Sequence, residues 1–302
     1  MITRRKFIHT SAATLAAGTA HAEEKEAPLF SVGLIADAQY VDADPGGIRH
    51  YRNSVKKLGS AVDSINEAEV DFSIHLGDLI DRKFESFDQI LEPLSKLKLS
   101  VIQIPGNHDF SVPDDKKPEV FGKLGMTKPY HSFSKSGFRF VFLDGTEVST
   151  FANTRESDVF KEASEILKQF KAEGRKNAKS WNGAISAAQL AWLKGELAAA
   201  KRAGEKVIIS CHYPILPDNS HNLWNDREVL AVIDQFPGIV AAWFNGHNHA
   251  GNYAERNGVH YVTVQGMVDT EDKNAFAVLD VTAEVLTIKG SGRVPSRVME
   301  LG

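Results

Sequence analysis

The sequence predicts one α/β domain, residues 23–302, in which two packed sheets are flanked by helices. Two observations favour this fold class. Short apolar runs alternate with segments in which apolar residues recur every three or four positions, a pattern typical of strands followed by helices. In addition, metal-binding residue types follow directly after several of the apolar runs, as they do at the ligand-binding edge of an open α/β sheet.

Strands and helices alternate in the first third of the chain. The expected order is strand, helix, strand, helix, strand, over Leu29–Ala36, His50–Glu67, Phe72–Leu76, Phe87–Leu97 and Val101–Ile104. The first helix is predicted from Tyr51, Val55 and Leu58, which lie on one stripe at helical spacing. The second helix carries Pro93, which disfavours helix in its middle.

The remaining two thirds begin with a proline-rich surface loop, residues 111–129, and later hold a polar, partly helical insertion, Thr154–Asn177. Ser186 and Gln189 form a capping-box start for a helix that reaches Ala200. The other expected elements are a hairpin (Tyr130–Ser134 and Phe138–Leu143), strands at Lys206–Ser210 and Ile239–Phe244, a helix at Asp226–Gln235, and short strands at Val259–Val264, Ala275–Asp280 and Val285–Lys289.

Composition excludes several functional classes. The chain has 302 residues, of which 42% are hydrophobic and 25% charged, an ordinary composition for a soluble domain with a large core. One cysteine permits neither an internal disulfide nor a thiolate metal site. No apolar run approaches the ~18 residues that span a bilayer. The net charge of −4 disfavours polymeric nucleic acid as a ligand.

The first 22 residues have the order of a signal peptide. Arg4–Lys6 is followed by the mildly apolar run Ser11–Ala20 and by the cleavage pattern Ala20-His21-Ala22. The arginine pair indicates export by the twin-arginine machinery, to the periplasm or the medium. The alternative is a basic, disordered terminus. Cleavage would remove three cations and no acid, changing the net charge from −4 to −7. Bound metal ions could then supply the positive charge that an anionic substrate needs.

Metal-binding side chains follow five of the expected strands. The candidate ligands are Asp37, Gln39, Asp78, Asn107, His212, His247 and His249. Taken alone, the Gly246–His249 motif would be read as a polar turn with two solvated histidines. The set as a whole provides oxygen and nitrogen donors, which suit Mn²⁺, Fe²⁺ or Zn²⁺. Seven ligands are too many for one tetrahedral ion with an open position. They suit two ions about 3.5–4 Å apart, with Asp78 as the bridge, which activate a water and hold a phosphoryl group for in-line attack.

His108 differs from the other histidines because it adjoins Asn107 on a turn led by glycine. We expect its ring to face the substrate and to protonate the leaving oxygen. The alternative is a structural role. Asp109 is a candidate to orient His108.

Other residues give weaker signals. Trp181, Trp224, Tyr253 and Phe151 could stack a base, although single aromatics more often pack in the protein. Arg52 and Arg293 could contact phosphate, although solvation is the more common state of a lone arginine. Cys211 precedes His212 on an extended segment, and we expect its side chain to be buried and inert.

The motifs Asp37-Ala38-Gln39, Gly77-Asp78, Gly106–Asp109, His212 and Gly246–His249, in this order, resemble the calcineurin-like metallophosphoesterase superfamily. The resemblance covers the whole mature chain. The superfamily usually has histidine where this chain has Gln39, and that departure resembles the manganese-dependent ADP-ribose/CDP-alcohol diphosphatase branch. Further stretches similar to that branch are His50–Ser54, Asn182–Ser186, Gln189–Leu193, Leu223–Asn225 and Gly290–Arg297. The loops 216–222 and 111–129 look shorter than in the branch's animal members.

The resemblance implies a four-layer αββα sandwich with two mixed sheets. It implies one ion held by Asp37, Gln39, Asp78 and His249, a second held by Asp78, Asn107, His212 and His247, and His108 as the catalytic residue. Asp81 stands where purple acid phosphatases carry tyrosine, so an iron–tyrosinate site is not expected.

The activity implied is hydrolysis of the phosphoanhydride bond of nucleoside diphosphate derivatives such as ADP-ribose or CDP-alcohols. The cofactor is two divalent ions, with Mn²⁺ favoured because Gln39 is a neutral amide donor, and with Fe or Zn as alternatives. A broader phosphomonoesterase or phosphodiesterase is the alternative activity. An inactive metal-bound scaffold that binds partners is the least favoured reading.

Overall fold

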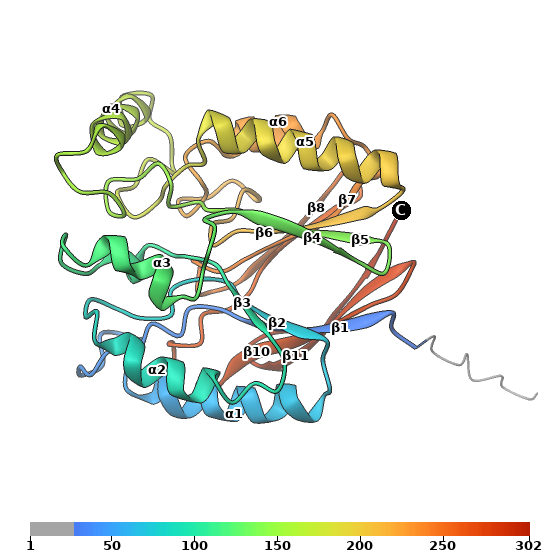
Figure 1. Ribbon diagram of the computed structural model, residues 1–302, viewed down its shortest axis with the longest axis horizontal. Coiled ribbons are helices and arrows are strands. Elements are labelled where there is room, and N and C mark those ends of the chain that lie inside the picture. Colours follow the sequence, from blue (N-terminus) through green and yellow to red (C-terminus); the bar gives the residue numbers. More distant parts are fainter. Residues whose placement is uncertain (1–26) are drawn as a thin grey trace, which may run out of the picture.

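The computed structural model describes residues 27–302, and the predicted signal peptide, residues 1–22, lies outside this part of the chain. Two six-stranded sheets pack against each other, and helices cover their outer faces (Figure 1). The α/β class predicted from the sequence and the αββα sandwich implied by the resemblance are both confirmed. No helix in residues 27–302 combines the length and apolar character that crossing a membrane requires.

The first sheet brings together three strands from the start of the chain and three from its end. Its order is β12 (Arg297–Glu300), β11 (Val285–Gly292), β10 (Ala275–Val281), β1 (Phe30–Ile35), β2 (Phe72–His75) and β3 (Val101–Gln103). Strands β1, β2 and β3 run parallel, whereas β10 pairs antiparallel with β1. Helices α1 (Asn53–Glu67) and α2 (Ser86–Leu94) lie along the outer face (Figure 1).

The second sheet comes from the middle of the chain. Its order is β4 (His131–Lys135), β5 (Phe138–Phe142), β6 (Lys206–Ser210), β7 (Val240–Asn245), β9 (Val259–Thr263) and β8 (Asn252–Arg256). Strands β5, β6, β7 and β9 run parallel. Helices α5 (Ala187–Ala203) and α6 (Asp226–Ile233) cover its outer face, and α4 (Asp158–Ala172) stands beyond the sheet edge (Figure 1).

The main core lies between the two sheets. Alternate residues of both inner faces meet there, among them Leu34, Ile74 and Phe140, all buried. On the outer face of the first sheet, α1 buries Leu58 and Val62 of its apolar stripe. Side chains of a strand alternate between faces, and the outward-facing residues, such as Ile35 in the first sheet and Ile209 in the second, are apolar and buried as well. Helices must therefore cover the outer face of each sheet.

Some element boundaries differ from the predictions. Helix α2 includes Pro93 but ends at Leu94, one residue after the proline, and does not continue to Leu97 as predicted. The predicted surface loop 111–129 contains a short helix, α3 (Val120–Lys123), whose Val120 is fully buried. Strands β8 and β12 were not predicted. Both lie at sheet edges and expose polar side chains, so neither carries a clear apolar pattern.

Candidate metal centre

The predicted ligand types gather at one edge of the two sheets. Asp37 follows β1, Asp78 follows β2 and Asn107 follows β3, while His212 follows β6 and His247 follows β7. These five strands run parallel within their sheets, so their carboxyl ends bring the side chains to one place.

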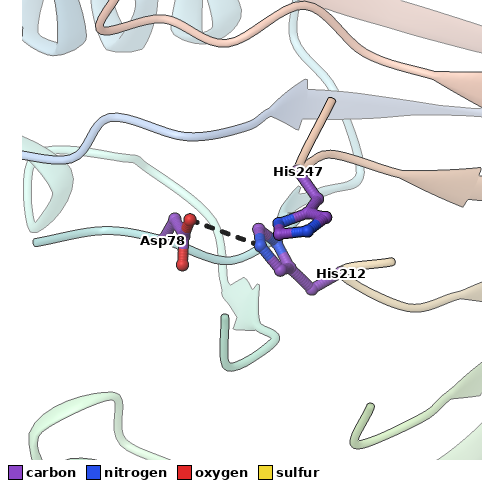
Figure 2. Close-up of side chains that lie close together, drawn as sticks. All are labelled: Asp78, His212 and His247. Atoms are coloured by element: carbon purple, nitrogen blue, oxygen red, sulfur yellow. Dashed lines mark ion pairs between the residues drawn. The ribbon is translucent and has the colours of Figure 1, made fainter. Parts of the chain in front are cut away.

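A compact group forms around Asp78. Ligand atoms of Asp78, His212 and His247 lie within 4.8 Å of one another, and all three residues are buried. Figure 2 shows the two imidazole rings side by side, with His212 directed at the carboxylate. His212 Nε2 lies 3.3 Å from Asp78 Oδ2. This spacing is compatible with a shared metal ion.

The other predicted ligands meet Asp78 from its second side. Gln39 Nε2 donates to Asp78 Oδ2 at 3.0 Å and lies 3.0 Å from His249 Nε2. His249 Nε2 lies 3.5 Å from Asp37 Oδ1. Both groups therefore contact the same carboxylate oxygen, Asp78 Oδ2, as they would around a bridging ligand. The Gln39 amide nitrogen points at these atoms, and its N–H groups face the lone pairs that a cation would otherwise bind. A flip of that amide would turn its oxygen, a metal donor, towards them.

Several side-chain atoms in this pocket that could bind a metal ion have no hydrogen-bond partner within residues 27–302. They include Gln39 Oε1, Asn107 Oδ1 and His212 Nε2, all buried. A buried polar atom without a partner costs about 1–3 kcal/mol, so three orphaned donors at one place are unusual. Because each of these atoms is also a suitable ligand for a divalent ion, the residues present fit a metal centre.

The electrostatics of the pocket also favour cations. Burial by itself lowers the pKa of a histidine, but Asp78 raises the pKa of His212 to about 9 and Asp37 raises that of His249 to about 9. Burial raises the pKa of Asp78, yet His212 and His108 together lower it well below its usual range. Histidine must be neutral to bind a metal, so metal binding would release protons here.

The backbone is strained where the ligands project. Asp37 (φ 53°), Gln39 (φ 43°), Asp78 (φ 59°) and His247 (φ 66°) all adopt left-handed conformations, which side chains other than glycine rarely accept. Such strain concentrates at functional sites because the surrounding structure must hold it. Gly106 permits the close approach of the third strand, since a Cβ there would lie 2.2 Å from Asp78 Oδ1.

Each histidine of the site is oriented by a hydrogen bond from its far ring nitrogen. His212 Nδ1 donates to the Leu76 carbonyl at 2.7 Å. His247 Nε2 donates to Asn182 Oδ1 at 2.8 Å, and His249 Nδ1 donates to Asp269 Oδ1 at 2.9 Å. These bonds fix the tautomer and direct the other nitrogen at the site. The supporting roles of Asn182 and Asp269 were not predicted.

His108 lies at the rim of the site, where its backbone N–H donates to Asp78 Oδ1 at 2.7 Å. The prediction that Asp109 orients its ring was wrong. His108 Nδ1 instead donates to Asp81 Oδ1 at 2.7 Å, and the Asp81 side chain is only 4% exposed. The Asp109 carboxylate turns inwards from the short helical turn His108–Phe110. It accepts backbone N–H groups of Asp78, Leu79, Ile80 and Gly106 at 2.8–3.2 Å.

A cavity of about 460 Å³ opens over the site. It is lined by Gln39, Arg49, Asp78, Asn107, His108, Ser111, Trp181, His221, His247 and His249. Arg49, Ser111 and His221 were not singled out from the sequence, since none follows a strand or belongs to a ligand motif. Trp181 is 44% exposed and presents an aromatic surface to the cavity.

The other aromatic candidates do not reach this cavity. Trp224 is fully buried and its Nε1 donates to the Lys179 carbonyl, so its proposed base-stacking role was wrong. Tyr253 lies on β8 with the Arg297 guanidinium 3.7 Å from its ring centre. Phe151 packs against two hydrophobic clusters, as favoured from the sequence.

Of the remaining single-residue predictions, those for Arg52 and Cys211 are confirmed and that for Arg293 is wrong. Arg52 is solvated, as expected, and forms exposed ion pairs with Asp42 and Asp44. Arg293 is not solvated, because its guanidinium donates to the carbonyls of Gly266 and His249. Cys211 is fully buried as expected, and burial raises the pKa of its thiol to about 12.

Comparisons with known proteins agree with this geometry. The model of the calcineurin-like phosphoesterase family matches residues 30–251. A human protein named manganese-dependent ADP-ribose/CDP-alcohol diphosphatase is 31% identical, over 90% of this chain and 92% of its own length. Its bovine counterpart is 30% identical, over 92% of this chain and 96% of its own. A solved zebrafish dimetal phosphatase superposes with a TM-score of 0.83 at 27% identity, covering 91% of this chain and 100% of that one. The chain therefore belongs to the calcineurin-like phosphoesterase family of hydrolases.

Proposed function

We propose that this protein hydrolyses the phosphoanhydride bond of nucleoside diphosphate derivatives, of the ADP-ribose or CDP-alcohol kind, with two divalent ions. The observation that carries this proposal is the set of buried, orphaned donors gathered on both sides of Asp78. The relatives that cover most of the chain are named for this activity and for manganese.

The donor geometry supports two ion sites that share Asp78. Asp37, Gln39 and His249 would complete one site, and His212 and His247 would complete the other. Asn107 would join the second site, because its buried Oδ1 has no hydrogen-bond partner in the described residues and the residue lines the same cavity. The ions would lower the pKa of a nucleophilic water and neutralise the charge on the phosphoryl oxygens. A neutral amide at Gln39 leaves the first site rich in oxygen donors, which favours Mn²⁺ over Zn²⁺.

The chain's own residues position the leaving group. The hydrogen bond to Asp81 occupies His108 Nδ1 and leaves Nε2 free to donate a proton to the departing phosphate oxygen. The Asp81 carboxylate stabilises the charged imidazole through Oδ1, and the Arg82 guanidinium lies 2.9 Å from Oδ2 of the same carboxylate.

The cavity over the site has the chemistry of a nucleotide pocket. The exposed face of Trp181 can stack a base, and the Arg49 guanidinium can pair with phosphate. Both residues line the same cavity as the metal-ligand candidates Asp78 and Asn107, so a nucleotide bound there would lie over the metal centre.

Isotope labelling tests the bond that is cleaved. ADP-ribose hydrolysed in ¹⁸O-water with Mn²⁺ should give AMP and ribose 5-phosphate, with the label in one of the two products only. Mass spectrometry of both products reads the result. Release of inorganic phosphate as the first product, or label in neither phosphate, would contradict phosphoanhydride cleavage.

We also propose that residues 1–22 direct export through the twin-arginine route, so that the mature protein acts outside the cytoplasm. The support is the order of the Arg4–Lys6 segment, the run Ser11–Ala20 and the pattern Ala20-His21-Ala22.

A further inference from the structure

Lys57 is a buried amine on the inner side of α1. The residue is 5% exposed, whereas the adjacent Lys56 is exposed. Lys57 Nζ donates to the carbonyls of Met267 at 2.5 Å, Thr270 at 2.9 Å and Asp269 at 3.2 Å. All three acceptors lie between β9 and β10. We call residues 266–270 the support segment.

The support segment holds one half of the metal centre. The Asp269 carboxylate orients the His249 ring, as described above. The next contacts are to the backbone around Asp37: Met267 N donates to the Ala36 carbonyl at 3.0 Å, and Val268 N donates to the Asp37 carbonyl at 2.9 Å. The segment therefore fixes His249 and the strained Asp37 turn together.

Arg293 contacts the same segment through different atoms. Its Nη1 donates to the Gly266 carbonyl at 2.8 Å and its Nη2 to the His249 carbonyl at 3.1 Å. Nη1 also lies 3.4 Å from Asp269 Oδ2. Asp269 thus stands between the imidazole of His249 and two cationic side chains.

The second half of the metal centre is supported by other residues. His212 is oriented by the Leu76 carbonyl and His247 by Asn182. Within residues 27–302, no hydrogen bond or ion pair joins Lys57 or Arg293 to His212, His247 or Asn107. The support is therefore asymmetric between the two ion sites.

Filling space does not explain a charged group at position 57. Burying an ammonium group is unfavourable, and here burial lowers the pKa of Lys57 to about 8. No salt bridge to a carboxylate compensates within the described residues, where its Nζ contacts are carbonyl oxygens. Methionine would fill the same volume without the desolvation cost. The ammonium group is needed to hold three carbonyls that point the same way.

We propose that Lys57 and Arg293 are positioning residues for one ion only, the ion held by Asp37, Gln39, Asp78 and His249. They act through the support segment, which presents Asp269 to His249 and fixes the Asp37 turn. This inference rests on the two-ion site proposed above.

The test is Mn²⁺ titration of the metal-free full-length protein by calorimetry, with the bound ions counted. Lys57→Met should weaken one of the two ions by about 10–100-fold, the usual effect of losing support behind a ligand, and leave the other unchanged. Lys56→Met removes a neighbouring exposed lysine and should leave both ions unchanged. In a His249→Ala protein, which keeps only the second ion, adding Lys57→Met should change nothing further.

The outcomes separate a failure of this inference from a failure of the proposed function. Equal weakening of both ions by Lys57→Met, or of neither, overturns the inference. If Lys57→Met does not fold, Arg293→Gln loosens the same segment from its partly exposed side and must weaken the same single ion; an Arg293→Gln protein with two unaltered ions overturns the inference as well. A wild-type protein that binds fewer than two ions would instead contradict the proposed function.

Discussion

Replacing Asp81 with asparagine tests how His108 is held for catalysis. The Asp81 carboxylate accepts the Nδ1 hydrogen of His108 at 2.7 Å from a site that is almost completely shielded from solvent. Hydrogen bonds to charged groups contribute about 1.5–3 kcal/mol, and each ~1.4 kcal/mol of barrier is a factor of ten in rate. Asp81→Asn should therefore lower kcat/KM for a nucleoside diphosphate substrate by about 10–150-fold and leave metal content unchanged.

The assay compares two substrates in each variant. The loss in Asp81→Asn should shrink for a substrate whose leaving group needs no proton, because His108 then has less to contribute. Asp109→Asn is the matched control. Its amide NH₂ group would replace one carboxylate oxygen and face two of the four backbone N–H groups, so the change should mainly lower the free energy of unfolding, by more than about 2 kcal/mol. Near-normal kcat/KM in Asp81→Asn, or an equal loss for both substrates in that variant, would refute this assignment.

Three further predictions follow from the same structure, and a fourth follows from the sequence of residues 1–22. His108→Ala should keep its metals and lose about 10²–10⁴-fold in kcat, measured at saturating substrate. Asp78→Ala should lose both ions by elemental analysis, because both groups of ligands contact its carboxylate. Burial raises the pKa of Asp144 from 3.8 to about 7, so ionisation of this carboxyl at higher pH opposes folding. Asp144→Asn should therefore raise the free energy of unfolding by up to about 4 kcal/mol at pH 8 and by little at pH 4. Denaturant unfolding at the two pH values measures the difference. Changing both Arg4 and Arg5 to lysine should trap the uncleaved precursor in the cytoplasm, as fractionation would show.

Each of these predictions has a clear contrary result. Near-normal kcat in His108→Ala would reassign that residue to a structural role. A fully active wild-type protein with one ion per chain would exclude a bridging Asp78. A stability gain in Asp144→Asn that does not grow between pH 4 and pH 8 would contradict a buried carboxyl whose pKa is raised. Normal export and cleavage of the double-lysine protein would rule out the twin-arginine route.

The positions of the expected ligands were predictable because the signal is local. Each ligand follows an apolar run, and parallel strands end at one edge, so residues as distant as Asp37 and His249 converge without further information. Buried strands such as β6 were predicted with their observed bounds for the same reason. Edge strands β8 and β12 were missed because partly exposed strands do not show a continuous apolar run.

The supporting contacts could not be read from the chain because they depend on side-chain direction. Asp109 is adjacent to His108, yet the two side chains point in different directions because both residues belong to a helical turn. The residue that contacts His108 is Asp81, which lies in the loop after β2. The buried role of Lys57 was equally hidden, since Lys56 and Lys57 are identical in type and differ only in the face of α1 that they occupy.

The proposed activity is tested most directly by the substrate preference of the Mn²⁺-loaded protein. We would measure kcat/KM for ADP-ribose, a set of CDP-alcohols, p-nitrophenyl phosphate and cyclic AMP under one set of conditions. At least one nucleoside diphosphate derivative should give the highest value, and removal of Mn²⁺ should abolish its hydrolysis. A higher value for p-nitrophenyl phosphate or cyclic AMP than for every diphosphate derivative would contradict the proposed activity.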